Sequence, residues 1–192
     1  MMLLMQKTDQ EIITDYLNGE KEEFTEIVNR YLKMVYNFVY RLVSSEKEAE
    51  DITQEVFLKV WKNVKNFDVE KSLKTWIFTI AKNTAFDYLR KRKDIPMSVF
   101  DNDEGENVIE DNLEDIERRP DEVFALAQNK KQINKVIKEL SIIQKEVIIL
   151  KYVNEMSLSE VSEIMDMSKD TVKSHHRRAI LKMRKLLSNK LT

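Results

Sequence analysis

The side chains with the clearest chemical potential are the cations close to the end of the chain. Between Ser168 and Lys190, eight lysines and arginines stand against one acid, Asp170, which makes a net charge of +7. Such a row of cations binds phosphates, and its clustering on one helix face is typical of DNA-binding proteins. The alternative interpretation is a solvated basic face on a core helix. At 100° per residue, the side away from the apolar residues carries Lys169, Lys173, Ser174, Arg177 and Arg184.

Two helices joined by a tight turn must position these cations. Ser157 and Glu160 form an S-x-x-E capping box, which predicts a helix start. Asp166 then tolerates a left-handed turn, and Ser168 can cap a second helix. This pattern predicts a helix-turn-helix whose second helix enters the DNA major groove. Because a solvated basic face explains neither the cap nor the turn, DNA binding is the favoured interpretation.

A second basic helix is predicted over residues 71–93, where seven cations stand against Asp87 alone, a net charge of +6. Phe78 and Phe86 lie among these cations on one side of the helical wheel. Rings among cations suit single-stranded DNA, because the rings stack on bases while the cations follow the phosphates. Equally, the two rings can pack beneath a neighbouring helix, and the sequence leaves these alternatives open. Trp61 and Trp76 are interpreted as core anchors, meaning aromatic side chains buried in the first domain.

A polar helix face is predicted at Asp51, Gln54, Glu55 and Leu58, which follow helical spacing. Carboxylates suggest metal binding or acid–base chemistry, but this half of the chain has no histidine and no arrangement typical of a nucleophile. A protein-docking face is therefore favoured over an active site. The neighbours His175 and His176 do not face each other on a helix and have no cysteine beside them, so packing or phosphate contact is favoured over metal binding. We expect no catalytic site, no metal and no cofactor.

Composition limits the fold class. The chain has 192 residues with only two glycines, two prolines and no cysteine. Few turn-forming residues predict an all-α protein, and the absence of cysteine suits a reducing cytoplasm. No apolar run is long enough to span a bilayer, so we expect a cytoplasmic protein without membrane insertion.

Charge divides the chain into parts. Residues 94–122 hold twelve acids and two arginines, a net charge of −10, between the two basic segments. This acidic stretch lacks sustained periodicity and is predicted to be a flexible linker. We therefore expect two small helical domains, residues 1–94 and 129–192, joined by a linker over residues 95–128.

Local signals mark the other helices. Thr8 with Glu11 and Ser45 with Glu48 each form a predicted capping box. A long helix should end near Ser44. Further helices are predicted to begin at Ser72, Pro120 and Ser141.

Three blocks appear in order: AEDITQEVFLKVW, KSLKTWIFTIAKNTAFDYLRKRK and LSIIQKEVIILKYVNEMSLSEVSEIMDMSKDTVKSHHRRAILKMRKLL. Together they resemble the bacterial RNA polymerase sigma factors, and specifically the compact extracytoplasmic-function (ECF) group of the sigma-70 family. The resemblance covers both predicted domains. Asp170 stands where the family usually has Gly, and His175-His176 replaces a more usual Arg-and-apolar pair.

The resemblance implies partners and roles. RNA polymerase core would dock on Asp51, Gln54, Glu55 and Leu58. The melted downstream promoter element would be held by the loop over residues 66–73 and the helix over residues 74–92, and the upstream element by the helix-turn-helix. An anti-sigma factor is a further implied partner. The implied DNA contacts are Lys74, Lys82, Asn83, Asp87, Arg90 and Lys91 in the first domain, and Lys169, Thr171, Lys173, Ser174, Arg177 and Arg178 in the second.

The resemblance thus implies a promoter-specificity subunit without a catalytic step. It would bind RNA polymerase core, recognise two promoter elements and stabilise a flipped-out base in opened DNA. The alternative from the residues alone is a helix-turn-helix repressor or activator with a sensor or dimerisation domain. A nucleic-acid enzyme would need an acidic metal site, for which the sequence offers no pattern.

Overall fold

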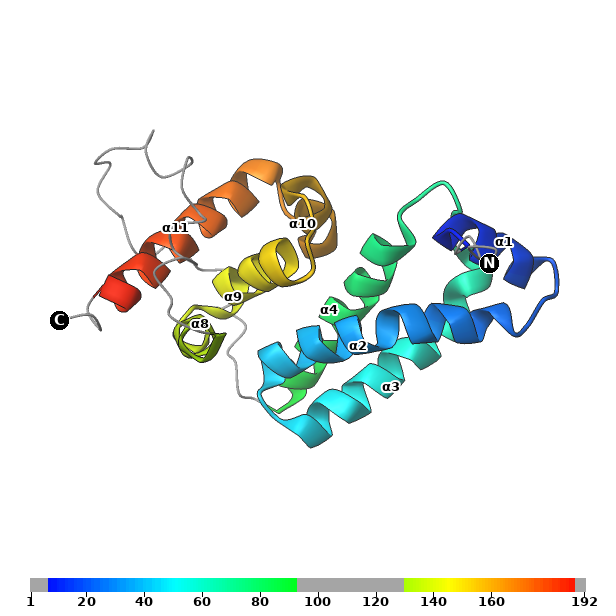
Figure 1. The fold of residues 1–192 in the computed structure, drawn as a ribbon, viewed down its shortest axis with the longest axis horizontal. Helices are drawn as coiled ribbons and strands as arrows, with labels where there is room; N and C mark the ends of the chain where they lie inside the picture. Colours follow the sequence, from blue (N-terminus) through cyan, green and yellow to red (C-terminus); the bar gives the residue numbers. More distant parts are fainter. Residues whose placement is uncertain (1–6, 93–129, 189–192) are drawn as a thin grey trace, which may run out of the picture. The chain divides into compact units, whose positions relative to one another are not determined.

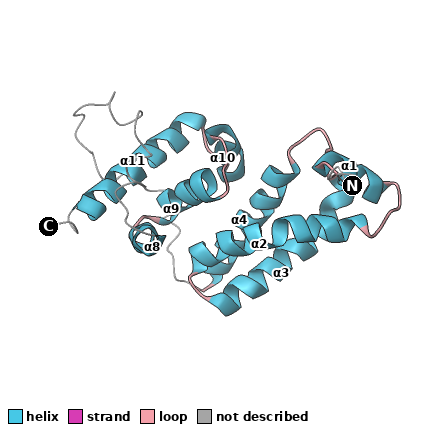
Figure 2. Ribbon diagram, in the orientation of Figure 1, coloured by secondary structure: helices cyan, strands magenta, loops and turns pink. Residues whose placement is uncertain are grey.

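The computed structural model describes residues 7–92 and 130–188. The chain divides into two compact units, residues 1–94 and residues 95–192, which are treated separately below. Every regular element in the described ranges is helical (Figures 1 and 2), which confirms the all-α prediction. The predicted linker over residues 95–128 and the first part of the helix predicted from Pro120 lie outside the described residues.

Three helices form the body of the first unit, and a short one packs against them. A 3-10 turn, Val64–Asn66, and a loop join the third helix to the fourth. The core holds Phe38, Val56, Ile77 and Phe78, all fully buried. The helices are α1 (Asp9–Leu17), α2 (Glu23–Val43), α3 (Glu46–Asn63) and α4 (Leu73–Lys91).

Local chemistry explains most ends of these helices. The predicted capping box of Thr8 and Glu11 starts α1, and Ser72 accepts a hydrogen bond from the Thr75 amide at the start of α4. Gly19, with φ of +112°, turns the chain between α1 and α2. Ser44 adopts a left-handed conformation and ends α2, as the sequence predicts.

The predicted capping box of Ser45 and Glu48 is wrong. Ser45 occupies the N-cap position of α3, but its side chain makes no capping hydrogen bond. The Glu48 carboxylate instead pairs with Arg92, just after the last turn of α4. The Glu48 side chain therefore forms a long-range ion pair and not the hydrogen bond to the Ser45 amide that a capping box requires.

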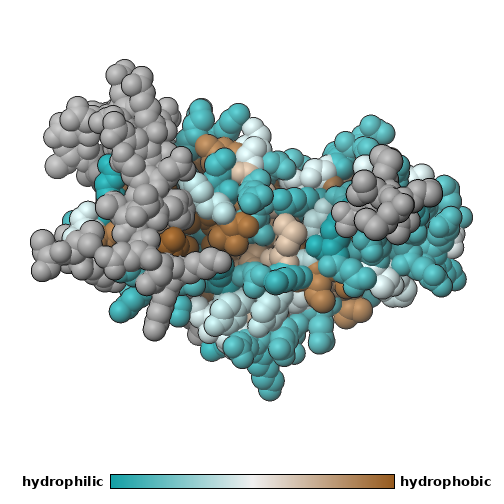
Figure 3. Space-filling model, viewed as in Figure 1, coloured by the Kyte–Doolittle hydropathy of each residue, from teal (hydrophilic) through white to brown (hydrophobic). Residues whose placement is uncertain are grey.

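The second unit packs its helices around the inner side of its longest one. α11 (Lys169–Ser188) contributes Ala179, Ile180 and Met183 to a core that also includes Val136 and Ile148. The other elements are α8 (Lys130–Lys138), α9 (Ile142–Ile148), the π-helical turn η2 (Ile149–Val153) and α10 (Leu158–Met165). Figure 3 shows a largely hydrophilic surface on the face drawn. Among the described helices, none has the length and apolar character of a membrane span.

Candidate docking face and nucleic-acid surfaces

The four residues predicted for docking share one exposed side of α3. Asp51, Gln54 and Glu55 are exposed, and Leu58 keeps 55% of its surface accessible. Glu55 pairs with Lys59 one turn later at 2.9 Å, and both side chains remain substantially accessible. The opposite side of α3 is buried through Ile52, Val56 and Val60. We call Asp51, Gln54, Glu55 and Leu58 the docking face.

Trp61 is not the core anchor that the sequence analysis predicts, because 53% of its surface is exposed. It follows the buried Val60 by one residue and is therefore rotated by about 100° away from the core. That rotation places it beside Gln54 and Leu58, seven and three residues earlier. The helical wheel of the sequence therefore already indicates that Trp61 is exposed. Trp76 is partly buried against Phe67, with ring centroids 4.9 Å apart, which is closer to the prediction.

Helix α4 presents most of its predicted DNA contacts on an outer face. Asn83 and Arg90 are exposed on this face, and the Arg90 guanidinium pairs with the Asp87 carboxylate at 2.6 Å. Lys82 lies at the edge of the face, with its ammonium nitrogen 5.8 Å from the centroid of the Phe86 ring. Lys91 is exposed in the last turn.

Lys74 does not share this face. It lies in the first turn, nine residues before Asn83, which is half a helical turn out of phase. The structure thus brings Lys82, Asn83, Asp87 and Arg90 together but leaves Lys74 on another side of α4.

Phe78 belongs to the core and is not available for stacking on bases. It is fully buried, and its ring meets the Phe38 ring edge-on with centroids 5.4 Å apart. Phe86 is only partly buried, so both alternatives remain open for that ring. Thr75 is buried beside Phe78, so part of the side that the sequence analysis places among the cations belongs to the inner face of α4.

The helix-turn-helix forms as predicted. The Ser157–Glu160 capping box starts α10, and Asp166, with φ of 55°, ends it in a left-handed conformation. The Ser168 hydroxyl accepts a hydrogen bond from the Thr171 amide at 3.1 Å and so caps α11. Val172 is fully buried and fixes the inner side of the first turn of α11.

The outer side of α11 carries the predicted DNA contacts. Lys169, Thr171, Lys173 and Ser174 are exposed, whereas Arg177 and Arg178 are partly buried. Asp170 lies among them with its side chain 93% exposed, and the Lys173 ammonium is 3.5 Å from it. Helical spacing brings Lys173, Ser174, Arg177 and Arg178 to one face, to which Asp170 adds the only described negative charge.

Both histidines of α11 pack within the second unit. His175 is buried, and the His176 ring stacks on Tyr152 with centroids 5.7 Å apart. The His176 Nε2 and the Tyr152 hydroxyl share a hydrogen bond of 2.8 Å. Burial lowers the pKa of His176 below its ordinary value, and the nearby charge of Lys151 lowers it further. The sequence analysis left packing and phosphate contact open for these histidines, and these contacts favour packing.

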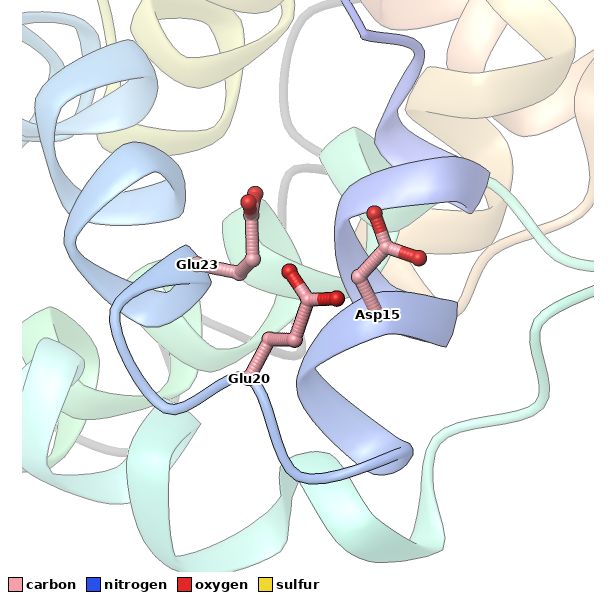
Figure 4. A group of neighbouring side chains, drawn as sticks. All are labelled: Asp15, Glu20 and Glu23. Carbon is pink, nitrogen blue, oxygen red and sulfur yellow. The ribbon is translucent and has the colours of Figure 1, made fainter.

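One cluster of carboxylates has the spacing of a metal site, but the ammonium group of a lysine pairs with two of its members. Asp15, Glu20 and Glu23 hold carboxylate oxygens within 4.8 Å of one another at the turn between α1 and α2 (Figure 4). The Lys7 ammonium lies 2.7 Å from both Asp15 and Glu23, and these hydrogen bonds raise the pKa of Lys7 above its ordinary value. We interpret the cluster as an ion-pair network that joins residue 7 to α1 and α2.

Comparisons with known proteins agree with this architecture. The family models of sigma-70 region 2 and sigma-70 region 4 match residues 27–95 and 130–183. The ECF RNA polymerase sigma factor SigW of Bacillus subtilis is 33% identical over 173 residues, covering 88% of this chain and 91% of SigW. The ECF sigma-E factor of Escherichia coli K12 is 28% identical, with 97% and 95% covered.

Solved structures share the fold. CnrH in complex with the cytosolic domain of CnrY aligns with a TM-score of 0.68 at 19% identity, over 94% of this chain and 97% of CnrH. The sigma factor RpoE, in complex with the anti-sigma factor NepR from Bartonella quintana, aligns with a TM-score of 0.65 at 24% identity, over 87% and 98%. With both family regions present in order and SigW matched along nearly its whole length, the chain belongs to the ECF group of the sigma-70 family of RNA polymerase sigma factors.

Proposed function

We propose that this chain is a promoter-specificity subunit, which binds RNA polymerase core, recognises two promoter elements and promotes DNA melting. The observation that carries the proposal is that the two units present different exposed surfaces. The first unit combines the exposed docking face on α3 with a polar and cationic face on α4. The second unit presents a cationic helix in a helix-turn-helix.

Each surface has a distinct chemical task. The docking face offers two carboxylates beside Leu58 and the exposed Trp61, a mixture suited to a protein partner that is cationic and partly apolar. The α4 face, with Lys82, Asn83 and Arg90, suits phosphates and unpaired bases. The α11 face suits the major groove of duplex DNA, where Lys and Arg read guanine edges and bind phosphates.

No covalent step belongs to the chain in this proposal; binding energy alone selects the promoter and holds the opened strand. The cytoplasm is the compartment in which this work takes place. An anti-sigma factor is a proposed regulatory partner, because CnrH and RpoE share the fold and RpoE was solved in complex with an anti-sigma factor.

Copurification with RNA polymerase core tests the proposal. The tagged full-length chain should retain stoichiometric core polymerase through a salt wash. A repressor or activator with the same helix-turn-helix would bind duplex DNA specifically while retaining no core. Recovery of specific duplex binding without core would therefore replace the proposal with that alternative.

A further inference from the structure

A groove of about 870 Å³ lies between the turn joining α1 to α2 and the C-terminal end of α3. Its walls combine two kinds of side chain. Three aromatic rings, Tyr16, Phe24 and Trp61, and three lysines, Lys21, Lys62 and Lys65, line it. Of these six residues the proposed function uses only Trp61, which borders the docking face; the other five have no role in it.

The lysines make the groove cationic. All three are exposed, and none of them forms an ion pair with another side chain in residues 7–92. No carboxylate is among the described residues that line the groove. A ligand with spaced negative charges is therefore complementary to this surface.

The aromatic rings restrict the class of anion. Tyr16 and Phe24 pack together with ring centroids 5.6 Å apart and form one wall, while Trp61 leaves about half of its surface accessible beside Lys62. Flat rings next to ammonium groups are the combination that holds single-stranded nucleic acid, because rings stack on bases and lysines follow the backbone. An acidic peptide would use the lysines but would gain less from the rings.

The groove is within reach of the loop before α4, which the family resemblance assigns to the opened strand together with α4. In the first turn of α1, the Gln10 amide donates a hydrogen bond of 3.1 Å to the Val69 carbonyl in the loop before α4. Tyr16 lies in the last turn of the same helix. Since α1 has nine residues, about 13 Å separate its ends, a distance that a few nucleotides span.

We propose that this groove binds a nucleotide of single-stranded DNA, with a base stacked on Trp61 and phosphates held by Lys21, Lys62 and Lys65. The inference rests on the proposed function, in which the first unit meets an opened strand. It adds a second point of contact for that strand, separate from α4.

The test uses the full-length chain and a fluorescent single-stranded oligonucleotide of mixed sequence, titrated at several salt concentrations. Trp61→Ala should weaken binding by about 5- to 150-fold, which corresponds to the loss of one base stack, whereas Trp61→Phe should retain most of the affinity. Lys21→Gln with Lys65→Gln should lower the salt slope by about 0.7 for each lost phosphate contact. Lys33→Gln with Lys47→Gln is the matched control, because both lysines are exposed and lie outside the groove.

Competitors identify the source of the ligand. Deoxyadenosine monophosphate should displace the oligonucleotide only weakly if the groove holds a strand, and strongly if it holds a free nucleotide; either result keeps a nucleotide site. Polyglutamate that competes as well as unlabelled oligonucleotide, together with wild-type binding by Trp61→Ala, would overturn the proposal in favour of an acidic protein segment. Failure of the unmodified chain to bind the oligonucleotide at low salt would also overturn it.

Core copurification of each variant separates this inference from the function on which it rests. Wild-type core recovery with unchanged oligonucleotide binding in the groove variants would refute the groove alone. Loss of core recovery by Trp61→Ala without any change in strand binding would assign Trp61 to the docking face and likewise refute the groove. Failure of the unmodified chain to recover core would instead refute the proposed function.

Discussion

The hydroxyl of Tyr152 and the Nε2 of His176 lie 2.8 Å apart and join the π-helical turn η2 to the helix α11. Their rings also stack, so the imidazole is held from two directions. Burial and the charge of Lys151 both disfavour the protonated ring and lower the pKa of His176 below its ordinary value. The neutral ring is thus the form that the second unit accommodates.

Stability of the second unit should therefore fall in acid. Below about pH 6.5 the unfolded chain protonates His176 more readily than the folded chain, so the free energy of unfolding decreases as pH falls toward the lowered folded pKa. His176→Gln should flatten this slope. His175 is the only other histidine, and it remains in both proteins, so the difference in slope reports His176. An NMR titration in which the His176 ring titrates at or above 6.5 would contradict the prediction.

The docking face should be needed for polymerase binding and dispensable for folding. Asp51→Lys with Glu55→Lys should abolish core retention in a pull-down while shifting the melting temperature little, because both carboxylates are exposed. Glu139→Lys with Glu155→Lys makes the same charge change at exposed positions of the second unit and should retain core. Equal retention by the two double variants would place the docking surface elsewhere.

Substitutions of the two phenylalanines of α4, Phe78 and Phe86, should affect folding stability and DNA binding differently. Phe78→Ala should cost about 3–5 kcal/mol of folding free energy, because it empties a fully buried site against Phe38. Phe86→Ala should cost far less stability. If that ring stacks on a base, the substitution should weaken single-strand binding by about 1–3 kcal/mol. Both tryptophans lie in the first unit, so tryptophan fluorescence during denaturant unfolding follows it selectively. A small stability loss in Phe78→Ala would refute the core assignment.

The turn of the helix-turn-helix should tolerate glycine better than a branched residue. Asp166 has φ of 55°, a conformation that costs most L-residues roughly 1–2 kcal/mol. Asp166→Gly should therefore leave stability nearly unchanged or slightly raised, whereas Asp166→Val should lower it. Thermal unfolding of the two variants by circular dichroism gives the comparison. A valine variant as stable as the glycine variant would mean that the turn relaxes out of this conformation.

Local signals predicted the elements well because the physics at these places is local. A hydroxyl and a carboxylate or amide three residues apart satisfy each other's backbone groups, and the structure has such caps at Thr8, Ser141 and Ser157. Asp166 likewise turns the chain by its own conformational tolerance. The family resemblance then supplied the assignment of surfaces to partners, which periodicity alone does not provide.

The errors had two causes: a partner from a distant part of the chain, such as Arg92 beside Glu48, and a local signal that was not used. Ala81 and Ala85 are both fully buried, and the buried arc of α4 runs from Ile77 past these small residues to Phe78. The sequence analysis places Phe78 among the cations and leaves its burial open, whereas the structure buries it. Trp61 was assigned to the core on residue type, although its place beside Leu58 on the wheel indicated exposure. The groove between Trp61 and the α1–α2 turn is formed by residues about forty positions apart in the sequence. No local sequence pattern predicts it.

Reconstituted transcription tests the central claim most directly. Core RNA polymerase alone should yield no specific transcripts from supercoiled DNA that carries the chain's target promoters, identified by transcript mapping after induced expression. Addition of the full-length chain should produce discrete start sites, and Lys173→Gln with Arg177→Gln should reduce their yield by weakening the upstream contact. Transcription at these sites by core without the chain, or no initiation when core and chain are combined at saturating concentrations, would contradict the account.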